Sequence, residues 1–144
     1  MKNIHAVVRY AGDDYFVAVP PSGHAITLDV KGDRSNAGGP LELLLVALGG
    51  CTGADVISVL IKKRQQVTDY FIEVHGERRE EHPRNFTRME VRHIVTGRAI
   101  SADAVAKAVE LSMTKYCSVA ATLRPTVEIV STIEIHEEES ATSA

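Results

Sequence analysis

Hydrophobic and polar residues alternate along the first part of the chain, which is typical of β-strands with one buried face. The alternation covers residues 3–10 and 14–19, and the intervening Ala-Gly-Asp-Asp sequence at 11–14 predicts the turn of a hairpin. A further short strand is expected over residues 25–30. The N-terminal part of the chain should therefore form antiparallel sheet.

A long apolar helix is predicted after a polar, glycine-rich loop at residues 31–39. Pro40 suits the first turn of a helix, and apolar residues with helical spacing continue from Leu41 to about Gln65. The first half of this helix is apolar nearly all round, so we expect it to be buried on every side. A single small domain has difficulty surrounding such a helix, which favours a partner subunit.

The second half of the chain predicts a hairpin followed by a helix. Strand-like alternation at residues 70–77 and 86–97 flanks a charged turn that should be solvated. The helix is expected to have Ser101 as its N-cap, to carry Ser112 on its inner face, and to end near Tyr116.

The C-terminal part predicts one further helical turn at residues 117–122 and a final strand at 127–135. Residues 137–144 are acidic and small, and they are expected to form a disordered tail. The chain shows no internal repeat and no composition break that would mark a second domain. We therefore expect a single domain over residues 1–136.

Composition and charge exclude some partners. At 144 residues, with 44% hydrophobic residues, the chain can bury a core without disulfides. Its 16 basic and 19 acidic residues give a formal charge of −3, so we expect neither nucleic acid nor an anionic membrane as a partner. No run approaches the roughly 20 apolar residues of a membrane helix, and the N-terminus lacks the apolar core of a secretory signal. These features predict a cytoplasmic protein.

The candidate chemistry centres on two cysteines, Cys51 within the apolar helix and Cys117 after the second helix. A lasting disulfide is not expected in the cytoplasm, so the cysteines are expected to cycle between oxidation states, to bind metal or to be inert buried hydrophobes. Metal binding is the weakest alternative because the chain has no CxxC pair, and we expect no bound metal or cofactor. The histidines show no ligand-like spacing around either cysteine: His5, His24, His75, His82, His93 and His136.

The sequence around Cys51 leaves several interpretations open. Gly49 and Gly50 each cost about 1 kcal/mol relative to alanine inside a helix. Either another helix packs closely against them, or they leave space for a substrate at the sulfur. Asp55 lies one turn beyond Cys51 on the same face, where its carboxylate would tend to raise the thiol pKa.

A reactive cysteine needs a neighbouring cation, and the candidates are Arg9 in the first strand and Arg34 in the loop before the helix. Either arginine is also compatible with a solvated surface position. Glu42 either favours the positive end of the helix dipole or cooperates with Cys51. In a straight helix the two residues lie on opposite faces, roughly 13 Å apart along the axis. Cooperation would therefore require a broken helix or a contact across a dimer.

Histidine-assisted hydrolysis is the rival chemistry, since His24, His75 and His93 could fold back toward a thiol. These histidines sit at alternating positions where half-exposed sheet residues are expected, and the sequence has no acyl-transfer motif. Redox function is therefore favoured over hydrolysis.

Two motifs in this order resemble the OsmC/Ohr family of osmotically induced and organic hydroperoxide resistance proteins. The first combines Pro40-Leu-Glu-Leu with Leu48-Gly-Gly-Cys-Thr52, and the second is Glu110-Leu-Ser-Met-Thr-Lys-Tyr-Cys-Ser118. The similarity covers about residues 20–136. The Gly-Gly-Cys form is similar to an OsmC-like branch of the family.

The resemblance implies an α+β fold in which two subunits form an intertwined homodimer, with antiparallel sheets wrapped around two central helices. It also implies a thiol-dependent peroxidase that reduces small organic hydroperoxides to alcohols at the dimer interface. Cys51 would attack the peroxide, and Cys117 would resolve the resulting sulfenic acid as a disulfide. An external dithiol reductant, lipoyl-linked in some members, would restore both thiols.

The chain differs from well-known members of the family in the residue that follows Pro40. They place an acidic residue directly after it, whereas here Leu41 follows Pro40 and the acid is Glu42. Glu42 is then the candidate partner of the activating arginine, which maps to either Arg9 or Arg34. The alternative function is a non-catalytic OsmC-like dimer that binds a small apolar ligand in its interface pocket.

Overall fold

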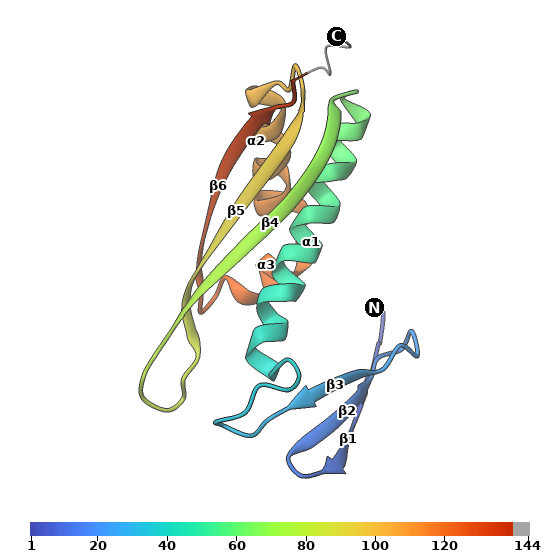
Figure 1. The fold of residues 1–144 in the computed structure, drawn as a ribbon, viewed down its shortest axis with the longest axis vertical. Helices are drawn as coiled ribbons and strands as arrows, with labels where there is room; N and C mark the ends of the chain where they lie inside the picture. Colours follow the sequence, from blue (N-terminus) through green and yellow to red (C-terminus); the bar gives the residue numbers. More distant parts are fainter. Residues whose placement is uncertain (140–144) are drawn as a thin grey trace. The chain divides into compact units, whose positions relative to one another are not determined.

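A computed structural model describes residues 1–139 as a mixed α+β fold with two three-stranded sheets (Figure 1). The predicted α+β class is therefore confirmed. The described chain divides into two compact units, Met1–Leu44 and the part that begins at Leu45. The expected single domain over residues 1–136 stays a prediction, and residues 140–144 of the expected tail lie outside the described residues.

The first unit contains an antiparallel sheet in which β1 (Val7–Gly12), β2 (Tyr15–Val19) and β3 (Ile26–Asp29) are neighbours in that order. This arrangement confirms the predicted hairpin and the short third strand. The turn between β1 and β2 contains left-handed backbone, with φ of 92° at Gly12 and 50° at Asp13. Glycine and aspartate tolerate these angles better than most residues, which explains why the hairpin turns here.

The helix α1 (Pro40–Lys62) begins where the sequence predicted. The Gly39 carbonyl accepts the first helical hydrogen bond from the Leu43 N–H, at 3.2 Å. The Gly39 N–H in turn donates to Glu42 Oε2 at 3.1 Å. Glu42 therefore makes the back-reaching contact of a capping box, which stabilises the start of α1.

The C-terminal end of α1 is closed by a left-handed residue, Arg64, with φ of 56°. Its N–H donates to the Ile61 carbonyl at 2.9 Å, and the Gln65 N–H donates to the Leu60 carbonyl at 3.0 Å. This is the hydrogen-bond pattern of a Schellman motif. Because the motif turns the chain sharply, the next strand starts at Gln66, earlier than the sequence pattern predicted.

The second sheet has the strand order β4 (Gln66–Arg78), β5 (Phe86–Arg98) and β6 (Glu128–Glu137). The β4–β5 hairpin is antiparallel, as predicted. The expectation of antiparallel sheets is wrong for the last pair, because β6 runs parallel to β5. The chain between these strands passes through helices, and such a crossover brings the next strand back in the same direction.

The crossover contains α2 (Ala102–Leu111), the π-helical turn η1 (Ser112–Tyr116) and the short helix α3 (Ser118–Leu123). Ser101 is the N-cap of α2, since its hydroxyl accepts a hydrogen bond from the Ala104 N–H at 3.1 Å, and this prediction is confirmed. The sequence pattern treated α2 and η1 as one helix because helical periodicity does not separate a π-turn from its neighbours.

The core of the second unit forms where α1 and α2 pack on one face of the sheet (Figure 1). Val56 and Leu60 of α1 meet Val95 of β5 and Val105 and Ala108 of α2. All five residues are fully buried. The core thus fixes the C-terminal half of α1 relative to α2.

The expectation that the first half of α1 is buried on every side is wrong for the single chain. Val46 is 67% exposed, whereas Leu48 on the opposite side is fully buried. By length and composition alone α1 could cross a membrane, so the expectation that no segment approaches a membrane helix is also wrong. One face of the helix contributes Val56 and Leu60 to the core of the second unit.

Candidate active site

The fold brings Cys51 and Cys117 together. Their sulfur atoms lie within 4.8 Å of each other, and both thiols are free. Cys51 is half-buried in the middle of α1, whereas only 3% of Cys117 is exposed. A disulfide requires sulfur atoms about 2.05 Å apart, so a modest movement would be enough to join them.

Cys117 lies at a junction between two irregular pieces of helix. Its N–H donates to the Ser112 carbonyl at 2.8 Å, which closes η1, and its sulfur accepts a hydrogen bond from the Ala120 N–H at 3.4 Å as the N-cap of α3. Burial, followed by the neighbouring Cys51 and Asp55, raises the pKa of the Cys117 thiol to about 11. Cys117 is therefore a protonated thiol at neutral pH.

A carboxylate and two hydroxyls complete this cluster. One oxygen of Asp55 lies within 4.8 Å of both sulfur atoms. Ser112 Oγ donates to Asp55 Oδ2 at 2.9 Å and lies 2.8 Å from Thr52 Oγ1. Thr52 and Ser112 are fully buried. The sequence pointed to Asp55 but to neither hydroxyl as part of a site, although a polar residue expected on an inner helix face, such as Ser112, was a usable signal.

Gly49 and Gly50 have different structural roles. A Cβ at Gly49 would lie 3.2 Å from Val74, and one at Gly53 would lie 2.6 Å from Ile72. These two glycines therefore permit close packing of α1 on β4. A Cβ at Gly50 would meet nothing within 4 Å, so close packing does not require this glycine. Close packing is confirmed for Gly49, although the neighbour is the strand β4 and not another helix, and space for a substrate at the sulfur stays a prediction.

The open side of the glycines borders a surface depression of about 540 Å³ between α1 and β4. Its lining includes Gly50, Gly53 and Ile57 of α1 and Tyr70 and Ile72 of β4. A second depression of about 490 Å³ adjoins it along the same two elements. Neither lining includes a cysteine, so these apolar surfaces lie next to the thiol site rather than around it.

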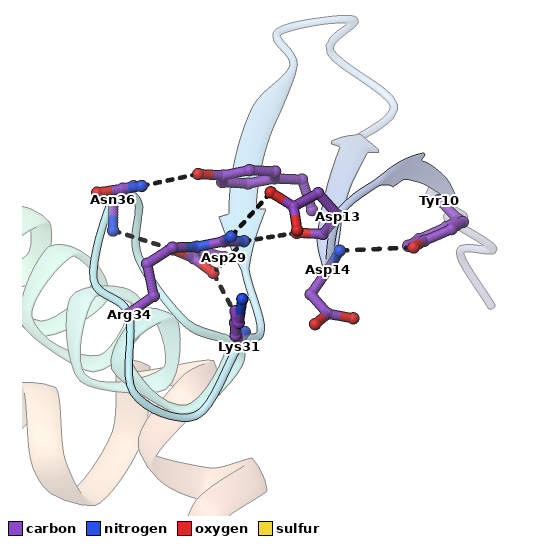
Figure 2. A network of polar contacts seen from close by, with 8 residues as sticks. Tyr10, Asp13, Asp14, Asp29, Lys31, Arg34 and Asn36 are labelled. Atoms are coloured by element: carbon purple, nitrogen blue, oxygen red, sulfur yellow. Dashed lines mark hydrogen bonds and ion pairs between the residues drawn. The ribbon is translucent and has the colours of Figure 1, made fainter.

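Arg34 is held within the N-terminal unit (Figure 2). Its guanidinium donates to both carboxylate oxygens of Asp29, at 2.9 and 3.0 Å, and to Asp13 Oδ2 at 3.0 Å. It also lies over the Tyr15 ring, 4.1 Å from the centroid. The hydrogen bond from Arg34 lowers the pKa of buried Asp29 to about 2, and the ion pair raises the pKa of Arg34.

Arg9 is exposed on β1, where it is opposite Val17 of β2. Within residues 1–139 it makes no ion pair, in contrast to Arg34. Glu42 remains at the start of α1, and this helix continues unbroken through Cys51. Cooperation of Glu42 with Cys51 through a helix break is thereby excluded.

The histidines do not join the thiol cluster in the part of the chain that the structure describes. His93 corrects the expectation of half-exposed sheet positions, because it is fully buried on the helix-covered face of β5. Its Nδ1 lies 2.7 Å from the Tyr70 hydroxyl, while its Nε2 has no hydrogen-bond partner within residues 1–139. Burial lowers the pKa of His93 to about 4 and raises the pKa of Tyr70.

An α+β fold with a cysteine in its long helix, and a second cysteine beside it at a crossover junction, defines an OsmC-type thiol protein. The family model described as OsmC-like protein matches residues 31–132, which include both cysteines. The chain belongs to the OsmC-like protein family.

Relatives match over nearly the whole chain. Protein YhfA of Escherichia coli K12 is 44% identical over 133 residues, which cover 92% of this chain and 98% of the relative. A crystal structure of a hypothetical protein from Aquifex aeolicus has 34% identity and a TM-score of 0.84, covering 96% of this chain and all of the other. An organic hydroperoxide resistance protein from Elizabethkingia anophelis shares the fold at 12% identity, with a TM-score of 0.70 over 94% of this chain and 98% of the other.

Proposed function

We propose that this protein is a cytoplasmic, homodimeric, thiol-dependent peroxidase that reduces small organic hydroperoxides to alcohols. The observation that carries this proposal is the position of two free cysteine sulfurs within 4.8 Å of each other. Membership in the OsmC-like family supports the redox assignment. The exposed apolar residues of α1, with Val46 at 67%, support the burial of this helix by a second subunit.

The proposed reaction has two chemical steps. The Cys51 thiolate attacks the peroxide, so that an S–O bond forms, the O–O bond breaks and the alcohol leaves after taking a proton. Cys117 then attacks the sulfenic sulfur of Cys51, an S–S bond forms, and the hydroxyl leaves as water with the proton from Cys117. An external dithiol, lipoyl-linked or otherwise, reduces the disulfide and is itself oxidised.

Exposure supports the order of the two cysteines. Cys51 is half-buried and is the more exposed of the two cysteines. Cys117 is buried, and its pKa of about 11 keeps it protonated until the sulfenic acid forms. A peroxidatic cysteine must meet substrate as a thiolate, whereas a resolving cysteine needs only to reach its partner.

We propose Arg9 as the activating cation. Arg34 already donates to two carboxylates and stacks on Tyr15, so its charge is largely neutralised within its own unit. Arg9 is exposed and makes no ion pair within residues 1–139, which leaves its guanidinium available to a thiolate.

The proposal is tested by mixing the reduced protein with a stoichiometric amount of cumene hydroperoxide or hydrogen peroxide. Peroxide loss and free thiols are followed for the wild type and for Cys51→Ser. Two thiols should disappear with one peroxide, faster for the organic peroxide, and Cys51→Ser should consume none. Persistence of both thiols in the wild type would refute peroxidase function.

A second candidate function is a ligand-binding dimer without catalysis. The two adjoining apolar depressions between α1 and β4, of about 540 and 490 Å³, favour this alternative because no cysteine lines them. This function predicts that the thiols survive peroxide, and that a small apolar fluorophore binds with equal affinity to the wild type and to Cys51→Ser.

A further inference from the structure

Three potential metal ligands converge at the cysteine pair. The sulfur atoms of Cys51 and Cys117 and one carboxylate oxygen of Asp55 all lie within 4.8 Å of one another. Cys51 and Asp55 are one turn apart on the same face of α1, and Cys117 reaches them from the N-cap of α3. In tetrahedral zinc sites, bond lengths of about 2.0–2.3 Å place the ligand atoms roughly 3.3–3.8 Å apart. Small side-chain rotations would bring this set to that geometry.

The donor types select the class of cation. Two of the three donors are thiols, which favour zinc and other thiophilic ions over magnesium and calcium. All three groups become negative when they bind a metal, yet within residues 1–139 no lysine or arginine forms an ion pair with Asp55. A divalent cation would neutralise charges that the described chain leaves unpaired.

The surroundings hold these donors in place. Ser112 donates to Asp55 Oδ2 at 2.9 Å and is 2.8 Å from the buried Thr52 hydroxyl. These hydroxyls fix the orientation of the carboxylate. No hydrogen bond within residues 1–139 occupies Asp55 Oδ1. The Ala120 N–H donates to the Cys117 sulfur at 3.4 Å. Hydrogen bonds of this kind to ligand groups are typical of metal sites in proteins.

A path to the site exists on the side of Asp55. A cavity of about 250 Å³ is lined by Asp55 together with Ser58, Lys62 and Tyr116. A hydrated ion or a fourth ligand can therefore approach the carboxylate without unfolding the surrounding helices.

We propose that the reduced protein binds one thiophilic divalent cation, represented by Zn²⁺, through the sulfurs of Cys51 and Cys117 and a carboxylate oxygen of Asp55. Water or a small solute fills the fourth position. Binding transfers the two thiol protons to the buffer and involves no electron transfer. Because a Cys51–Cys117 disulfide removes both sulfur donors, the cation and the disulfide exclude each other. Oxidation of the two cysteines to the disulfide should therefore release the bound cation.

The test titrates metal-free, reduced protein with Zn²⁺ against a chromophoric chelator, and with Co²⁺ as a spectroscopic probe. One ion should bind per chain, and Co²⁺ should give sulfur-to-metal charge-transfer bands with the intense visible absorption of a tetrahedral site. Ser112→Ala should weaken binding roughly 10-fold, as loss of an outer-shell partner does, and Cys51→Ser, Cys117→Ser and Asp55→Asn should weaken it more. Asp103→Asn, which removes an exposed charge elsewhere, is the matched control.

Several results would overturn this inference. It fails if Cys51→Ser, Cys117→Ser or Asp55→Asn binds Zn²⁺ as tightly as Asp103→Asn, or if peroxide-oxidised protein retains the ion. It also fails if Co²⁺ gives no sulfur charge-transfer band. The proposed function is judged separately: thiols that resist peroxide while Zn²⁺ binds would refute only the peroxidase, whereas disulfide formation without Zn²⁺ binding would refute only the metal site.

Discussion

The hydroxyl of Ser112 donates a hydrogen bond to the carboxylate of Asp55 at 2.9 Å. This contact joins the π-turn η1 to the middle of α1, and Thr52 extends it into the core at 2.8 Å from the Ser112 oxygen. The two segments that carry the cysteines are therefore connected by a buried polar chain. The connection thus links the helix that carries Cys51 to the turn that ends beside Cys117.

Ser112→Ala should destabilise the reduced protein by about 1–3 kcal/mol, because it leaves buried polar groups without a partner. Urea unfolding of the wild type and the variant measures this difference in the free energy of unfolding. Ser58→Ala removes an exposed hydroxyl from the same helix α1, and it should change stability by no more than about 0.5 kcal/mol. Equal effects of the two substitutions would show that the Ser112 hydroxyl has no structural role.

The raised pKa of Cys117, about 11, predicts a change of stability in alkali. Below a pH of about 8.5 the thiol is protonated in both the folded and the unfolded chain, so it causes no change of the free energy of unfolding with pH. As the pH rises toward 11, the unfolded chain loses this proton first, and the stability of the reduced protein should fall. Cys117→Ser keeps a capping side chain but has no thiol proton to lose. The free energies of unfolding of the wild type and this variant should therefore diverge as the pH rises toward 11. Parallel curves would contradict the prediction.

The lowered pKa of His93, about 4, predicts a loss of stability in acid. Between pH 6.5 and 4 the unfolded chain binds a proton at this histidine that the folded chain excludes, which should cost on the order of 2–3 kcal/mol. Above pH 6.5 the residue is neutral in both states and has no effect. His93→Gln should show a shallower decline of stability with falling pH than the wild type. The same slope for both proteins would mean that His93 binds its proton over the same pH range in the folded and the unfolded chain.

Substitution of the two arginines should separate a structural role from a catalytic one. Arg34→Ala removes the partner of buried Asp29, so it should lower the melting temperature. Arg9→Ala should leave the melting temperature unchanged and slow oxidation of Cys51 by roughly 10-fold or more, equivalent to about 1.4 kcal/mol in the barrier. Stopped-flow peroxide reactions and thermal unfolding of both variants check this. Slower oxidation in Arg34→Ala alone would reverse the assignment.

Much of the fold could be predicted from local patterns. Alternation gave both hairpins, Pro40 marked the first residue of α1, and Ser101 marked the N-cap of α2. The parallel pairing of β6 with β5 could not be predicted in this way, because strand direction depends on the path of the whole crossover. The end of α1 was also missed, because Arg64 adopts a left-handed conformation that favours glycine.

The candidate site was only partly visible in the sequence. Cys51 and Cys117 were found from their contexts, but the ligand-like set of Cys51, Asp55 and Cys117 was not, because spacing rules for metal sites search along the chain and these donors meet through the fold. Ser112 was expected only as a position on the inner face of its helix, and Thr52 only as part of the cysteine motif. Their hydrogen bond becomes apparent only when α1 and η1 are placed together.

The most direct measurement is peptide mapping of the reduced protein after one equivalent of cumene hydroperoxide and an acid quench. A single disulfide is expected between the peptides of Cys51 and Cys117, with the intact chain lighter by two hydrogens. Cys117→Ser should stop at a sulfenic acid on Cys51 that a dimedone probe captures, and Cys51→Ser should remain unmodified. A wild-type protein that keeps both thiols while the peroxide persists would contradict the central claim.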